Sequence, residues 1–340
     1  MSKTRTALVL GATGGVGGEV ARALLCGGWR VRALHRRPHD QRNKAEANGI
    51  EWVSGDAMQR DQVIAAAEGA DVIVHGVNPP GYRNWRGLAL PMLESSIAAA
   101  KSSGARIVFP GTVYNFGPDA FPVLRERSPQ NPTTRKGKIR VEMERRLESV
   151  SADGVRTLIV RAGDFFGPRT GNSWFAQGLI KPRRPIQSIT YPGRPDAGHA
   201  WAYLPDVAEA VVQLLDREPE LADFDVFHFG GHWLEPGIEM ARAIQRVVGK
   251  PHPQIRRFPW ALAYLASPFV TVLREMLELR YLWQQPVRLD NAKLVAFLGT
   301  EPHTPIDDAV RTTLLGLGCL HGGDAVRPTA GPKTRATAIG

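Results

Sequence analysis

The chain has 340 residues, of which 43% are hydrophobic and 22% are charged. This composition is that of a globular protein and excludes the disordered and fibrous classes. The length suits one large domain, or a nucleotide-binding domain with a smaller companion. The formal net charge is +10, but arginine pairs lie scattered over different segments. We therefore expect no nucleic-acid partner, and instead an attraction for anionic cofactors and small-molecule substrates.

No apolar stretch reaches the roughly 20 residues that a bilayer-crossing helix needs, and the apolar start at residues 7–10 is too short for a signal peptide. The two cysteines, Cys26 and Cys319, lie almost a chain length apart, which favours a reducing compartment. We expect a cytoplasmic protein with no membrane partner. Arg256, Arg257 and the apolar run from Trp260 are the only hint of a membrane-surface role, and their ordinary interpretation is a lid helix packed on the core.

Short apolar runs alternate with helical patterns over the first 160 residues, which is typical of successive βαβ units and a parallel sheet. The predicted strands are residues 6–10, 30–34, 50–53, 71–74, 106–109 and 156–160, and the predicted helices are 19–26, 60–67, 88–101 and 138–150. In the last helix, Arg140 and Glu144 lie off the apolar stripe, so we expect them outside the buried face. Further on, the pattern predicts helices at 205–216 and 238–248 and a strand at 225–229.

This order predicts an α/β protein with a Rossmann-type doubly wound parallel sheet in residues 1–165 and a smaller C-terminal α/β substrate lid in residues 166–318. Segments near 200–230 are expected to return to the Rossmann domain. Residues 319–340 have little apolar pattern and are expected to form a flexible tail.

A glycine-rich turn follows the first predicted strand and precedes the first predicted helix. Its candidate cofactor-binding residues are Gly11, Thr13, Gly14, Gly15, Val16 and Gly17. Glycines permit a tight turn and let backbone N–H groups approach a pyrophosphate, which then lies at the positive end of the helix. In this context the turn predicts a bound dinucleotide.

The second predicted strand ends without the carboxylate that NAD-binding folds use to hold the ribose 2′-hydroxyl. Arg36 and Arg37 follow it instead. Because cations favour a 2′-phosphate, NADP(H) is the more expected cofactor, although both arginines could be solvated loop charges. Asp56, beside Ala57, is placed either to accept a hydrogen bond from the adenine amino group or to cap a helix.

Ordered landmarks resemble the extended short-chain dehydrogenase/reductase superfamily, the NAD-dependent epimerase/dehydratase-like proteins, from Thr6 to about residue 318. They are the glycine turn, Gly55-Asp56, Val74-His-Gly-Val77, Val108-Phe-Pro-Gly-Thr112, Lys138-Ile-Arg-Val-Glu142, Arg161-Ala-Gly-Asp-Phe-Phe-Gly-Pro168 and Trp201-Ala-Tyr-Leu-Pro-Asp-Val-Ala208. The resemblance implies that Gly76 and Val77 also line the cofactor site, that Asp164 faces substrate, and that a homodimer is possible. His199, in the lid region, is a further candidate to face substrate, with a surface loop as the alternative. We expect no metal, because Gly230 and Gly231 between His228 and His232 indicate a strand end and a loop.

That superfamily moves a hydride to or from the nicotinamide while a tyrosine exchanges the proton, helped by a lysine four residues later and a Ser or Thr on the fifth strand. Thr112 and Lys138 match two of these three positions, and Lys138 would also bind the cofactor ribose. The tyrosine position, however, is Thr134, and an aliphatic hydroxyl cannot replace a phenol as an acid–base group.

Two main functions remain open from the sequence, besides the nucleic-acid or membrane-surface role at which Arg256, Arg257 and the run from Trp260 hint. One is an NAD(P)-dependent oxidoreductase or epimerase/dehydratase-like enzyme acting on a small carbonyl or hydroxyl substrate, in which Tyr114 supplies the proton. The other is a non-catalytic NADP(H)-binding sensor or assembly protein, for which the missing tyrosine is the sequence mark.

Overall fold

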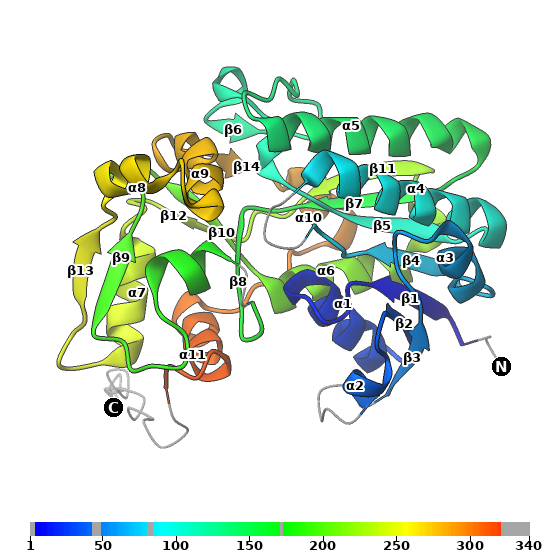
Figure 1. Ribbon diagram of the computed structural model, residues 1–340, viewed down its shortest axis with the longest axis horizontal. Coiled ribbons are helices and arrows are strands. Elements are labelled where there is room, and N and C mark those ends of the chain that lie inside the picture. Colours follow the sequence, from blue (N-terminus) through cyan, green and yellow to red (C-terminus); the bar gives the residue numbers. More distant parts are fainter. Residues whose placement is uncertain (1–3, 43–48, 80–83, 171–172, 321–340) are drawn as a thin grey trace, which may run out of the picture.

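The computed structural model describes residues 4–42, 49–79, 84–170 and 173–320. Its centre is a parallel sheet of seven strands, in the order β11-β7-β5-β4-β1-β2-β3 (Figure 1). The strand order reverses between β1 and β4, which is the switch point where doubly wound folds bind ligands beyond the carboxyl ends of their strands. The strands of this sheet are β1 (Thr6–Leu10), β2 (Arg30–His35), β3 (Ile50–Ser54), β4 (Val72–His75), β5 (Arg106–Gly111), β7 (Thr157–Arg161) and β11 (Phe224–His228).

Helices cover both faces of the sheet, so its strands are apolar on both sides. One face carries α1 (Gly15–Cys26) and α6 (Leu204–Asp216), whose buried residues share a core with Val31, Val74 and Val160. The other face carries α3 (Arg60–Ala66), α4 (Trp85–Ser103) and α5 (Arg135–Ser149). The short α2 (His39–Arg42) lies between β2 and β3.

The second, smaller unit is built from small sheets and helices beyond the carboxyl ends of the main strands (Figure 1). Its sheets have the orders β12-β10-β8, β13-β9 and β14-β6. These strands are β6 (Val123–Leu124), β8 (Asp164–Phe166), β9 (Ser188–Tyr191), β10 (His199–Tyr203), β12 (His232–Leu234), β13 (Gln254–Arg257) and β14 (Arg288–Leu289). The helices are α7 (Glu239–Val248), α8 (Trp260–Ala266), α9 (Thr271–Glu278) and α11 (Ile306–Gly316), whereas α10 (Ala292–Leu298) packs on β11 and the core of the main sheet. We call this unit the lid.

The predicted fold class is confirmed, because the seven strands are parallel and helices flank both faces. β11 pairs with β7 in parallel, so the chain returns from the lid to the edge of the main sheet. Residues 321–340 of the expected tail lie outside the described residues. No described helix is both long and apolar enough to cross a membrane.

One expectation about α5 is wrong. The helix begins at Arg135, three residues earlier than predicted, because Thr134 caps it: the Oγ1 of Thr134 accepts a hydrogen bond of 2.9 Å from the backbone N–H of Gly137. Arg140 and Glu144, expected outside the buried face, are buried as well. They face the carboxyl ends of the main strands, where Arg140 hydrogen-bonds to Asn78 and Glu144 to Arg161.

Candidate functional site

The glycine turn after β1 is packed so closely that side chains are excluded from it. Gly11 has a φ of +86°, and a methyl group on it would lie 2.6 Å from the carbonyl oxygen of Gly76. A methyl group on Gly17 would lie 2.4 Å from the carbonyl oxygen of Gly11. The glycine turn and the loop after β4 therefore approach each other at the switch point. This loop contains Gly76 and Val77, which are expected to line the cofactor site.

The first turn of α1 is open to an anion. Its N-cap, Gly14, has no side chain to cap the helix, and no acidic residue lies in that first turn. The first N–H groups of a helix lack partners within the helix and carry partial positive charge. Thr13 and Gly14 are exposed beside them. A glycine turn that leads into the first N–H groups of a helix fits the pyrophosphate of a dinucleotide.

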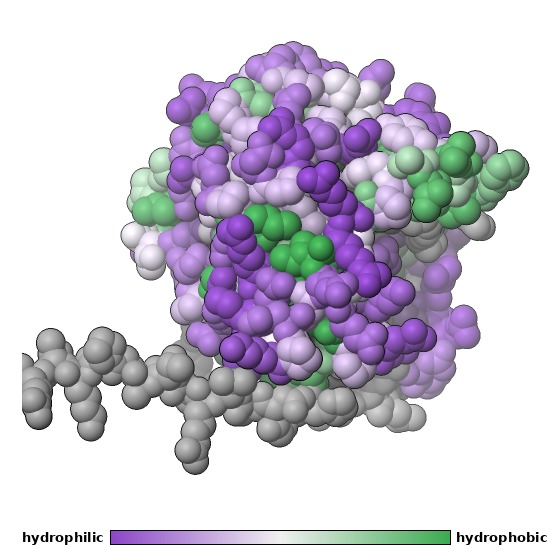
Figure 2. Space-filling view, turned by 90° about the vertical axis from the view of Figure 1, so that its left-hand side faces the viewer, coloured by the Kyte–Doolittle hydropathy of each residue, from purple (hydrophilic) through white to green (hydrophobic). Residues whose placement is uncertain are grey.

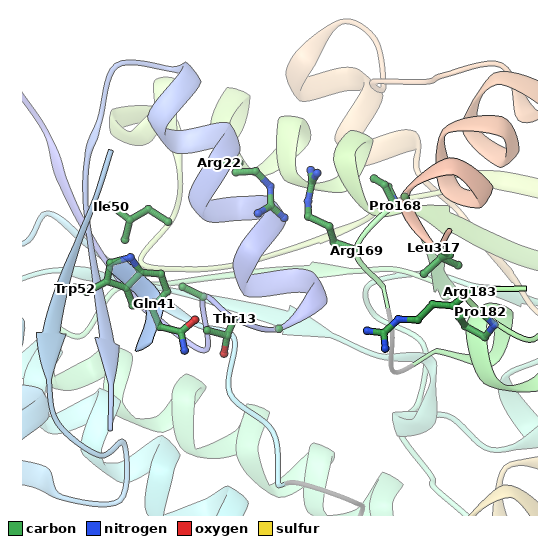
Figure 3. Close-up of a pocket in the computed structure, with 13 residues that line it drawn as sticks. Thr13, Arg22, Gln41, Ile50, Trp52, Pro168, Arg169, Pro182, Arg183 and Leu317 are labelled. Carbon is green, nitrogen blue, oxygen red and sulfur yellow. The ribbon is translucent and has the colours of Figure 1, made fainter. Parts of the chain in front are cut away.

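A cavity of about 600 Å³ adjoins this turn and continues to the lid. Figure 3 shows Arg183 extending from the lid toward Thr13, with Gln41 next to Trp52 on the other side of Thr13. Arg22 of α1 and Arg169 of the lid lie beside each other above it. The cavity therefore gathers cationic side chains from segments far apart in the sequence.

Glu19 ties the lid to α1 inside this region. It is a buried carboxylate that accepts from Arg169 at 2.8 Å and lies 3.3 Å from Arg22. Arg183 differs, because its side chain has no polar partner among the described residues, and its φ is +61°. Such a backbone is strained for a residue other than glycine, and strain of this kind concentrates at functional sites.

The other expected nucleotide contacts, which follow β2 and β3, differ in their exposure and their partners. Arg36 is exposed after β2, whereas Arg37 lies 3.9 Å from Asp40, so part of its charge is balanced. Asp56 is not a helix cap, since the N-cap of α3 is Gln59. Its Oδ1 accepts from the backbone N–H of Met58 at 3.0 Å, next to Ala57.

The face of α5 that is buried against the main strands is not the face that the sequence predicted. Lys138 is exposed on α5, whereas Lys136 and Arg140 are only 2% and 5% exposed. Both cations lie over the ring of Trp85, at 5.9 and 5.3 Å from its centroid. Residues four apart share a helix face, so the tyrosine–lysine spacing of the superfamily falls on Lys136 and Arg140. This geometry does not favour the roles expected for Lys138 and Thr134.

Arg140 lies at the carboxyl ends of β4 and β5. It donates to Oδ1 of Asn78 at 2.8 Å and to the carbonyl oxygen of Pro110 at 3.4 Å. Burial, and secondarily the charge of Arg140, lower the pKa of His75 from 6.5 to about 3. The imidazole of His75 is therefore neutral at physiological pH, and its Nδ1 lies 2.8 Å from the hydroxyl of Ser96.

Thr112 and Tyr114 follow β5 next to this pair. A methyl group on Gly137 would lie 2.2 Å from the carbonyl oxygen of Tyr114, so the first turn of α5 packs against that segment. Thr112 donates to Oδ1 of Asn115 at 3.3 Å, and both Thr112 and Tyr114 are partly exposed. The first turn of α5, which carries Lys136, therefore lies against the segment that carries Thr112 and Tyr114.

A buried ion pair between Arg161 and Glu144 stabilises the part of the site that contains Thr112. Arg161 of β7 donates to Glu144 of α5 at 2.7 Å and to the carbonyl oxygen of Thr112 at 2.6 Å. Its Nε donates to Nε2 of His228 at 3.2 Å. Burial, and then the charge of Arg161, lower the pKa of His228 to about 3. A neutral His228 can accept from Arg161 while its Nδ1–H donates to Leu124.

The two residues expected to face substrate pair with each other. Nε2 of His199 lies 2.8 Å from Oδ2 of Asp164, and the imidazole stacks on Trp283 with ring centroids 3.9 Å apart. Burial, and secondarily the carboxylate of Asp164, raise the pKa of the nearby Tyr191. No described cluster of three or more His, Cys, Asp or Glu side chains is placed to hold a metal ion.

Sequence reasoning missed Lys136, Arg140, Arg169 and Arg183. A signal for the first two existed, since Lys136, Arg140 and Glu144 recur at intervals of four, and Glu144 meets Arg161 from a recognised landmark. Nothing in the local sequence marks Arg169 or Arg183, because both reach the glycine turn only through the fold.

Comparison with known proteins identifies the family. The profile of the NAD dependent epimerase/dehydratase family matches residues 7–228. A 3-diazoavenalumate denitrifying reductase from a Streptomyces species is 30% identical over 277 residues, which cover 75% of this chain and 85% of that protein. An uncharacterised protein of Sinorhizobium fredii is 30% identical over 182 residues, 47% of this chain, and the match spans about half of that relative, 51%.

A solved structure shares the fold. UDP-glucose 4-epimerase from Bifidobacterium longum, in complex with NAD+ and UDP, superposes with a TM-score of 0.68 at 16% identity, covering 92% of this chain and 97% of that one. The glycine turn, the parallel sheet and the family profile agree over the same part of the chain. The chain therefore belongs to the NAD-dependent epimerase/dehydratase family.

Proposed function

We propose that this protein is an NAD(P)(H)-dependent oxidoreductase acting on a carbonyl or hydroxyl group of a small substrate. In this proposal Lys136 and Arg140 take the places of the family's tyrosine and lysine. The observation that carries it is the buried cationic pair on α5, which lies at the carboxyl ends of β4 and β5. Pro110, whose carbonyl oxygen accepts from Arg140, lies two residues before Thr112, and the glycine turn follows β1 at the neighbouring switch point.

The bound nicotinamide supplies the hydride chemistry, so that the carbonyl is reduced and the cofactor oxidised. Lys136 donates a proton to the carbonyl oxygen as the new O–H bond forms, and it is reprotonated from solvent. Arg140 keeps its proton at any working pH, so it orients the cofactor and stabilises negative charge on the oxygen instead. Thr112 donates a hydrogen bond to the same oxygen. Tyr114 remains the alternative proton donor.

We further propose that NADP(H) is preferred over NAD(H). Arg36 is exposed after β2, and Arg183 points toward Thr13 across the cavity without a polar partner among the described residues. In this proposal Arg36 pairs with the 2′-phosphate, and Arg183 adds positive charge across the cavity. Arg22 and Arg169 already share Glu19, so they are less available to a ligand.

Single-turnover oxidation of NADPH by a panel of small aldehydes and ketones tests the activity. Lys136→Met should lower the rate by about 10²- to 10⁴-fold, the usual share of acid–base catalysis. Lys138→Met is the matched control, because it removes the same charge two residues away on the exposed face, and it should leave the rate unchanged. Tyr114→Phe distinguishes the alternative donor.

The opposite ranking of the two lysine variants would refute the assignment of Lys136. Normal NADPH binding with no oxidation by any carbonyl would contradict the enzyme and favour the cofactor sensor. A double variant, Lys136→Tyr with Arg140→Lys, restores the family's pair on the same helix face and should support turnover if the geometry is right.

Calorimetric titration with NADPH and NADH tests the cofactor preference. Loss of one charge-assisted contact in Arg36→Ala should weaken NADPH binding by about 1.5–3 kcal/mol while changing NADH binding little. Arg183→Ala should act in the same direction, and Arg184→Ala, an exposed neighbour outside the cavity lining, serves as the control. Equal wild-type affinity for the two cofactors would refute the preference.

A further inference from the structure

The lid exposes large apolar side chains where the sequence predicted a packed helix. Leu262, Leu265 and Phe269 are 64%, 75% and 90% exposed, and Tyr264 and Val270 are exposed as well. We call these five residues the lid tip. Isolated exposed apolar residues are ordinary, but a contiguous group of this size on one projection marks an interaction surface. Figure 2 shows an apolar lobe projecting at one edge of the molecule, at the height of α8 and α9.

The opposite side of α8 is firmly attached, so the exposure of the lid tip is a property of the folded lid. Nε1 of Trp260 donates to the carbonyl oxygen of Pro192 at 2.8 Å. The guanidinium of Arg280 lies over the rings of Trp260 and Tyr264, at 5.1 and 5.6 Å, and donates to the Tyr264 hydroxyl at 3.0 Å. Ala263 on the same helix is buried. The helix is thus held by one side while it presents the other to solvent.

The lid tip lies in an uncharged stretch of the chain that arginines flank. Residues 258–273 contain no charged side chain. Exposed arginines stand at both ends of this stretch, namely Arg256 and Arg257 on β13 and Arg274 on α9. Among the described residues, no ion pair involves any of these three. An uncharged apolar tip with a cationic border matches a bilayer with anionic headgroups, because apolar side chains enter the interface while arginines remain at headgroup level.

We infer that the lid tip docks on the surface of an anionic lipid bilayer, and that the flanking arginines bind its headgroups. The protein would lie on the membrane without spanning it. A second copy of the chain is a poorer occupant, because a symmetric contact would bring the same arginines of both copies together. This inference departs from the sequence-based expectation of no membrane partner, and it does not depend on the proposed reaction.

Co-sedimentation of the full chain with vesicles tests the inference. Binding is measured on pure phosphatidylcholine vesicles and on vesicles that also contain phosphatidylglycerol, at low and at high salt. We expect binding to the anionic vesicles that weakens with salt, since screening shortens the reach of the arginines. Leu265→Glu combined with Phe269→Glu should reduce this binding at least tenfold. Arg256→Gln combined with Arg257→Gln should reduce it and flatten its salt dependence.

Leu315→Glu is the matched control, because it places the same charge at another exposed leucine of the lid, 41% exposed on α11. It should bind vesicles like the wild type. Circular dichroism and thermal melting of each variant establish that the fold is intact. Three results would overturn the inference: no binding to either vesicle, binding that the lid-tip variant leaves unchanged, or a dimer in light scattering that the lid-tip variant dissociates without lipid.

Discussion

The buried pair of Arg161 and Glu144 is expected to stabilise the fold only as a pair. Both side chains are nearly inaccessible, with side-chain exposures of 1% and 5%. In Arg161→Met, Glu144 loses its partner in the ion pair and still accepts from the side chain of Gln130, at 3.0 Å. A buried charge that loses its partner costs about 3–5 kcal/mol. Average unfolding entropy for 340 residues is about 0.7 kcal/mol/K, so Tm should fall by about 4–7 °C.

A double-mutant cycle measured by urea unfolding separates this cost from packing. Glu144→Met should destabilise by a similar amount, because it leaves Arg161 without its carboxylate. The double variant should cost less than the sum of the two by at least about 1 kcal/mol, since no unpaired charge remains. Arg146→Met is the control on the same helix. Its pairs with Glu94 and Glu142 are exposed, so its loss should cost about 0–1 kcal/mol. Additive single losses would refute the reasoning.

Three other perturbations test the same structure. Burial lowers the pKa of His75 and His228 to about 3, so between pH 6.5 and 4 only the unfolded state gains their protons. As the pH falls through this range, the free energy of unfolding should decrease by up to about 1.4 kcal/mol per pH unit for each histidine. His228→Gln should therefore show a shallower pH dependence of urea unfolding. Gly11→Ala should abolish cofactor binding in titration, whereas Gly28→Ala, with a similar φ of +78° but no atom within 4 Å of the added methyl, should only lower Tm slightly. Thr134→Ala should cost about 1 kcal/mol in urea unfolding through the lost cap, with Ser102→Ala, at an exposed position of α4, as the control. A far larger loss of turnover than of stability would return Thr134 to a catalytic role.

Local patterns in the sequence carried the Rossmann architecture. Apolar runs such as residues 6–10 and 106–109 mark strands covered on both faces, and the glycine turn is recognisable because its tight packing excludes side chains. Period and turn chemistry are local properties, so they can be read without the fold. The absence of a carboxylate after the second strand is equally local, and it already pointed to Arg36.

Tertiary structure decided which side chains form the site. The cap at Thr134 and the ion pair of Glu144 with Arg161 set the rotation of α5, and this rotation turns Lys136 and Arg140 inward and Lys138 outward. A helical pattern cannot reveal this, because a buried cation looks like a solvated one until its partners are known. Arg183 approaches Thr13 from a distant segment. The run after Trp260 resembles a core helix in sequence, and it is exposed because no other described element covers that side.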